Sequence, residues 1–117
     1  MKPFSVRVIT PYQSSFPDPL QLPAGLRVAV TDKKTHYEGW LWCTDPAGKS
    51  GWVPQSYLAR RGGSAVLLRD YDATELTVQF GEELLVSEEE SGWYWCRAAD
   101  GRRGWVPAEH VERSDPQ

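Results

Sequence analysis

The sequence predicts an all-β fold of two small five-stranded barrels in tandem, and three observations support this prediction. A sixteen-residue segment occurs twice, as GWLWCTDPAGKSGWVP at residues 39–54 and GWYWCRAADGRRGWVP at residues 92–107, with nine identical positions and a constant offset of 53. Short β-branched and aromatic runs alternate with Pro, Gly, Asp and Ser. No stretch of ten or more residues keeps a helical period. A duplication of this kind indicates a repeat architecture.

Each copy contains four runs with the pattern of short strands. In the first copy they are VRVIT (6–10), LRVAV (26–30), WLWCT (40–44) and SGWVP (50–54), and in the second AVLLRD (65–70), EELLVS (82–87), WYWCRA (93–98) and RGWVP (103–107). The connections CTDPAGKSGW and CRAADGRRGW are typical of tight hairpins. A copy of about 50–55 residues favours a barrel closed on itself, which hides the strand edges. We expect the first barrel at 1–60, a linker at 61–64, the second barrel at 65–113 and a tail at 114–117.

The charge is distributed unevenly between the copies. The chain carries a net charge of −3, but residues 1–64 sum to +4 and residues 65–113 to −6. The strongly acidic second copy and the sparse basic pairs disfavour nucleic-acid binding. The apolar runs are far shorter than the roughly 20 residues of a membrane span, and the N-terminus alternates polar and apolar residues instead of forming a secretion signal. A cytoplasmic protein is therefore expected.

Four ordered blocks in each copy resemble the Src-homology-3 domain. The second copy has AVLLRDYDA, ELTVQFGEELLV, WYWC and GRRGWVPAEHV, and the first has VRVITPYQ, LQLPAGLRVAV, WLWC and GWVPQSYL. The resemblance implies a non-catalytic interaction module without a cofactor, which binds an extended or proline-rich segment of a protein partner across a strip of aromatic rings. Such a segment is already extended before binding, so it loses little chain entropy.

The resemblance assigns binding residues in both copies. The peptide-binding candidates are Tyr12, Trp40, Pro54 and Tyr57 in the first copy, and Tyr71, Trp93 and Pro107 in the second. The second copy departs from the family pattern by carrying Arg69, Glu109 and His110 where the family has Tyr, Asn and Tyr, and the first by carrying Thr10 and Ser56. The acidic rim expected in two loops of the second copy consists of Asp72, Glu75, Glu88, Glu89 and Glu90. The first-copy groove is thus expected to hold the ligand, while the second copy supplies charge.

Other readings of the sequence remain open. The oppositely charged barrels could dock within one chain or between two chains, which includes a homodimer, with no functional groove. Cell-wall binding, known in bacterial relatives of the fold, would require a secretion signal. Cys43 or Cys96 with His36 or His110 could suggest a thiol nucleophile, but each Cys stands where the family has a small core residue. We expect two reduced, buried thiols, no metal site and no enzyme.

Overall fold

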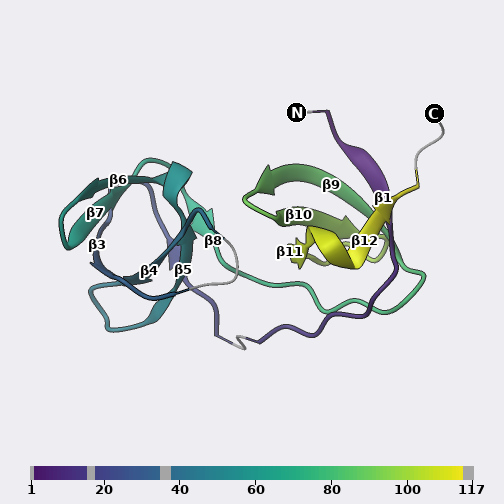
Figure 1. Ribbon diagram of the computed structural model, residues 1–117, viewed down its shortest axis with the longest axis horizontal. Helices are drawn as coiled ribbons and strands as arrows, with labels where there is room; N and C mark the ends of the chain where they lie inside the picture. The colour runs from purple at the N-terminus through teal and green to yellow at the C-terminus, as the bar shows by residue number, and fades with distance from the viewer. Residues whose placement is uncertain (1, 16–17, 35–37, 115–117) are drawn as a thin grey trace. The chain divides into compact units, whose positions relative to one another are not determined.

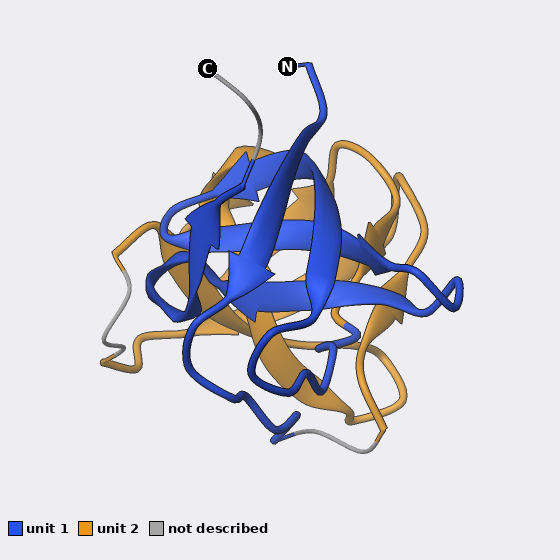
Figure 2. Ribbon diagram, turned by 90° about the vertical axis from the view of Figure 1, so that its right-hand side faces the viewer, with its two compact units in different colours: residues 1–17, 74–117 blue, residues 18–73 orange. Residues whose placement is uncertain are grey.

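The protein is built from short antiparallel strands that form two compact units. The computed structural model describes residues 2–15, 18–34 and 38–114 (Figure 1). Unit 1 comprises residues 1–17 and 74–117, and unit 2 comprises residues 18–73 (Figure 2). The chain therefore leaves unit 1 once, completes unit 2 and returns. This division differs from the expected one after residue 60, and the difference arises from the pairing of two strands.

Unit 1 contains a five-stranded sheet of order β11-β10-β9-β1-β12. Its elements are β1 (Phe4–Val8), β9 (Glu83–Glu90), β10 (Trp93–Ala98), β11 (Arg103–Pro107), the 3-10 helix η2 (Ala108–His110) and β12 (Val111–Arg113). Alternate residues of these strands face a core that includes Val6, Val8, Leu84, Val86 and Val106, each at most 2% exposed. The apolar residues at every second position of the sequence therefore form the inner face of the barrel.

Unit 2 contains the equivalent sheet, of order β5-β4-β3-β7-β6. Its elements are β2 (Gln21–Leu22), β3 (Arg27–Thr31), β4 (Trp40–Thr44), β5 (Ser50–Pro54), the 3-10 helix η1 (Gln55–Tyr57), β6 (Leu58–Arg61), β7 (Ser64–Leu67) and β8 (Tyr71–Asp72). Strands β2 and β8 form a separate two-stranded sheet. Val28, Val53, Ala65 and Leu67 lie in the interior of unit 2.

The two copies exchange their first strands. Strand β1 comes from the first copy but pairs with β9 and β12, while β7 comes from the second copy but pairs with β3 and β6. The two strands occupy equivalent positions, because Val8 pairs with Val111 as Leu67 pairs with Leu58. Each unit is therefore a barrel of the predicted kind, assembled from both copies.

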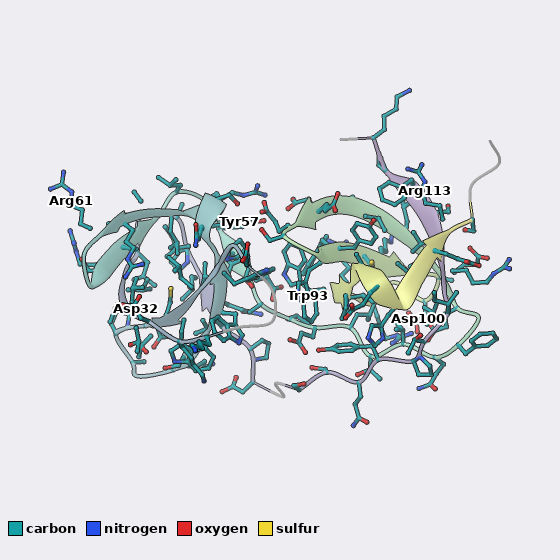
Figure 3. All side chains as sticks on the ribbon, viewed as in Figure 1. Asp32, Tyr57, Arg61, Trp93, Asp100 and Arg113 are labelled. Atoms are coloured by element: carbon teal, nitrogen blue, oxygen red, sulfur yellow. The ribbon has the colours of Figure 1, made fainter. Side chains whose placement is uncertain are left out.

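The prediction of an all-β chain with two five-stranded barrels is confirmed, but residues 61–64 are not a linker. Strands β6 and β7 form one hairpin in which Arg61 pairs with Ser64, and Gly62 and Gly63 make its turn. Gly62 has a φ of 58°, a value that glycine adopts without steric cost. Figure 3 shows Arg61 at the outer end of this hairpin. The short segment thus joins two strands of one barrel.

The two cysteines are buried thiols, as expected. Cys43 and Cys96 are free and 0% exposed, and each sulfur lies within 3.7 Å of the carbonyl oxygen two residues earlier. Burial raises the pKa of the Cys43 thiol to about 11, although the charge of Arg60 opposes the shift, and burial raises the pKa of Cys96 to about 12. Both side chains therefore act as small apolar core residues.

Candidate functional site

Tyr12 joins the second copy's acidic side chains in unit 1. Its hydroxyl donates a 2.7 Å hydrogen bond to Glu75 Oε1, and the same oxygen accepts a 3.0 Å bond from the backbone N–H of Ser15. Reciprocal backbone bonds between Tyr12 and Val78, of 3.0 and 2.8 Å, hold the segment in an extended form. The exchange of β1 therefore brings Tyr12, which follows that strand, beside Glu75.

Trp93 completes an aromatic pair with Tyr12. The two ring centroids lie 5.7 Å apart in an edge-to-face arrangement, with 82° between the planes. Trp93 opens β10 after a tight turn in which Ser91 and Gly92 have φ values of 43° and 91°. Figure 3 marks Trp93 on this strand. Both rings are partly exposed, so they offer apolar surface to a ligand.

The three consecutive glutamates lie on strand β9 and not in a loop, which corrects the expectation. Glu90 pairs with Trp93, Glu89 with Tyr94, and Glu88 with Trp95. Directly paired residues share a face of the sheet, so Glu88 and Glu90 lie on the face of Trp93, while Glu89 lies on the opposite face. Burial, assisted by the charge of Glu89, raises the pKa of Tyr94. Of the three glutamates, Glu88 and Glu90 therefore share the face of Trp93.

His110 also packs against Tyr12. The ring centroids are 5.4 Å apart in an edge-to-face arrangement, and His110 Nδ1 lies 3.1 and 3.2 Å from the carbonyl oxygens of Thr10 and Pro11. Both carbonyls accept, so Nδ1 carries the proton. The buried Pro107 precedes η2, the 3-10 helix that ends at His110. In the sequence, His110 stands where the family has a tyrosine. In the structure, its side chain binds the segment that precedes Tyr12.

The candidates of unit 2 form a second, more buried cluster. Trp40, Tyr57 and Tyr71 are 8%, 3% and 5% exposed, and the Tyr57 and Tyr71 rings lie 5.2 Å apart. The Tyr71 hydroxyl donates a 3.0 Å bond to the carbonyl of Trp52. Pro54, fully buried, pairs with Trp40 across β4 and β5. This cluster presents little ring surface.

A cation enters the unit 2 cluster. The Arg69 guanidinium lies 4.4 Å from the centroid of the Tyr57 ring, a cation–π distance. Arg69 stands where the family pattern has its first tyrosine, so the substitution replaces a ring by a positive charge. The signal was visible in the sequence, but its contact with a tyrosine of the other copy depends on the strand exchange.

The structure thus regroups the predicted site residues. Tyr12, Trp93, Pro107, Glu75, Glu88 and Glu90 belong to unit 1, and Trp40, Pro54, Tyr57, Tyr71 and Asp72 to unit 2. Tyr12, expected to form a groove with Trp40, contacts Trp93 within unit 1, whereas Trp40 belongs to unit 2. Asp72 is exposed on β8 of unit 2, where it pairs with Gln21, whereas the glutamates of β9 belong to unit 1.

The exchange also reduces the charge contrast. Unit 2 contains seven Lys and Arg against six Asp and Glu, and unit 1 contains six against ten. Among the described residues, no group of three or more His, Cys, Asp or Glu side chains could hold a metal ion. Within the same part of the chain, no helix has the length and apolar character required to cross a bilayer.

A family comparison agrees with the barrel geometry. The model of the variant SH3 domain matches residues 6–60 and residues 65–113. The chain belongs to the variant SH3 domain family. Modules of this family are generally non-catalytic and bind protein or peptide segments.

The variant SH3 chain also has a curated relative. It is 40% identical over 48 residues to the myosin heavy chain IB of Acanthamoeba castellanii, an alignment that covers 38% of this chain and 4% of that protein. The chain therefore spans only a small part of this relative. No solved structure matches it.

Proposed function

We propose that the protein is a non-catalytic interaction module whose unit 1 binds an extended, proline-rich partner segment that carries a basic residue. The observation that supports this proposal is the meeting of Tyr12 and Trp93 with the carboxylates of Glu75, Glu88 and Glu90 in one unit. Rings supply apolar surface for prolines, and carboxylates attract an Arg or Lys side chain of the ligand. A cytoplasmic adaptor is the setting that we propose, in agreement with two free buried thiols.

The ligand site is assigned to unit 1 because its rings are more accessible. Tyr12 and Trp93 are partly exposed, whereas Trp40, Tyr57 and Tyr71 are buried. The positive charge of Arg69 over Tyr57 would also repel a basic ligand residue from unit 2. The alternative of docking between oppositely charged barrels loses support, because the exchange leaves unit 2 nearly neutral.

The test is a binding titration with fluorescently labelled proline-rich peptides, each prepared with and without an Arg. We expect Trp93→Ala to weaken binding of the Arg-containing peptides at least tenfold, since the apolar surface of the indole ring is lost. Trp42→Ala is the matched control, because Trp42 belongs to unit 2, where its ring packs on that of Trp52 at 5.0 Å. Equal affinities of Trp93→Ala and the parent protein would refute the assignment, as would a library without any bound peptide.

A further inference from the structure

An arrangement without the strand exchange would contain equivalent strand pairings. If β1 and β7 traded places, β1 would lie between β3 and β6 and β7 between β9 and β12, as the matching registers require. The inward residues would remain apolar, since Val6 and Val8 correspond to Ala65 and Leu67, all at most 2% exposed. Backbone hydrogen bonding therefore does not distinguish the two arrangements.

The most distinctive side chain of β1 would also find equivalent neighbours. Phe4 packs edge-to-face on Tyr94 at 5.5 Å and lies under the Arg113 guanidinium at 4.1 Å. Figure 3 shows Arg113 beside β1. The repeat offset places Leu41 and Arg60 at the corresponding positions of unit 2. An apolar residue and an arginine are thus available to Phe4 in both barrels.

The connections, in contrast, differ between the arrangements. In the observed fold β6 continues into β7 through Gly62 and Gly63 alone, which closes a local hairpin at low entropic cost. In the other arrangement these two residues would have to join strands of different barrels. Three Cα–Cα steps reach only about 11 Å, so the two strand ends would have to lie within that distance of each other.

The second connection acts in the same direction. From Tyr71 to Leu76 the second copy has five steps, whereas the first copy has eight from Tyr12 to Leu20. In the observed fold this short segment does not fold back on itself. The Ala73 N–H donates to the Leu20 carbonyl in unit 2, while the next residue, Thr74, accepts from the Trp105 N–H in unit 1. A short connection whose neighbouring residues bond to different units favours exchange.

We propose that the lengths of these two connections, and not the strand contacts, select the exchanged fold, so that the same chain has a second arrangement in which each copy folds by itself. Lengthening both connections then returns β1 to unit 2 and β7 to unit 1. Tyr71 would take the place of Tyr12 beside Trp93. The proposal concerns strand pairing alone and does not depend on peptide binding.

The test inserts about twelve Gly and Ser residues between Gly62 and Gly63, which span about 20 Å on average, together with three residues after Ala73. Two cysteine pairs report the position of β1 through a short thiol crosslinker. Arg7→Cys with Glu112→Cys reports the exchanged fold, since Arg7 pairs with Glu112. Arg7→Cys with Ala59→Cys reports the alternative, because Ala59 pairs with Val66, the equivalent of Arg7. The buried Cys43 and Cys96 do not compete for the reagent.

In the parent chain we expect the Arg7–Glu112 pair to crosslink and the Arg7–Ala59 pair not to. In the lengthened chain the yields should reverse at least tenfold. A chain with the same Gly and Ser insertion in the β4–β5 turn, between Ala47 and Gly48, is the control and should keep the parent pattern. Retention of the Arg7–Glu112 product in the lengthened chain overturns the proposal. A second variant carries only the insertion between Gly62 and Gly63. Failure of both this variant and the chain lengthened at both connections to fold also overturns the proposal, because the alternative arrangement must be stable once the connections permit it.

Discussion

The Tyr12 hydroxyl donates a 2.7 Å hydrogen bond to Glu75 Oε1, although 63 residues separate the two. The bond joins a ring from one sequence copy to a carboxylate from the other, within a single barrel. Glu75 is held further by the Ser15 N–H and by a backbone bridge to Trp105. The pair therefore fixes both the aromatic and the acidic side of the proposed ligand site.

The first prediction concerns this pair. Tyr12→Phe should lower the free energy of unfolding by about 1.5–3 kcal/mol, the range of a hydrogen bond to a charged group. Glu75→Ala, which removes the acceptor, should cost at least as much, and the double variant should cost less than the sum, since the shared bond is lost once. Urea unfolding of the four proteins measures the coupling. Strict additivity would show that the bond contributes nothing.

The second prediction uses the alternation of β9. Because Glu90 faces the side of Trp93 and Glu89 the opposite side, Glu90→Gln should weaken binding of an Arg-containing peptide about two- to fivefold, the range of a partly exposed ion pair. Glu89→Gln changes the net charge equally and should leave affinity unchanged. The difference between the variants should shrink at high salt. Equal losses in both would indicate long-range attraction without a defined subsite.

The third prediction compares two equivalent glycines. A Cβ at Gly104 would lie 2.7 Å from the Leu76 backbone nitrogen, whereas a Cβ at Gly51 would meet only the Leu20 side chain, at 3.0 Å. Side chains move more readily than backbone, so Gly104→Ala should destabilise by about 1–3 kcal/mol and Gly51→Ala by less than about 1 kcal/mol. Urea unfolding measures both. The reverse order would contradict the close approach of residues 75–76 to β11.

The fourth prediction follows from the buried thiols. With pKa values of about 11 and 12, Cys43 and Cys96 should stay unreactive towards a disulfide reagent at pH 8 and react fully in guanidinium. The unfolded thiols ionise near pH 9, so the folded state binds their protons more tightly. The corresponding stabilisation is complete below about pH 9 and declines as pH rises towards 11. Thermal unfolding at pH 7 and pH 10, compared with Cys96→Ala, tests the decline; rapid labelling of the folded chain would contradict the burial.

The barrels were predictable because their determinants are local and repeated. Strand alternation, the duplicated Trp, Gly and Pro positions and the absence of helical periods specify each sheet whichever strand fills the β1 position. The exchange was not predictable from those patterns, because VRV at 6–8 and AVL at 65–67 carry the same kind of strand signal. In our proposal, the pairing is decided instead by the two short connections, at residues 62–63 and 71–76.

The sequence predicted the residue types of the candidate site, but not which residues of the two copies lie together in one barrel. The family resemblance singled out Tyr12, Trp93 and Glu75, and all three meet in unit 1. The resemblance placed Tyr12 in one groove with Trp40, because it was applied to each copy separately and assumes that each copy folds by itself. The faces of Glu88, Glu89 and Glu90 required the register of β9, which a shift between Trp95 and Cys96 makes hard to derive from the sequence.

The interleaved order of the strands sets a schedule for synthesis. Strand β1 has its pairing partners at residues 83–86 and 111–113, which are synthesised long after it. Unit 2 lacks β7 and β8 until residue 72 has been made. Strand β1 therefore stays unpaired until β9 has been made, and a nascent chain that stalls before residue 83 presents an unprotected Phe4–Val8 edge to chaperones.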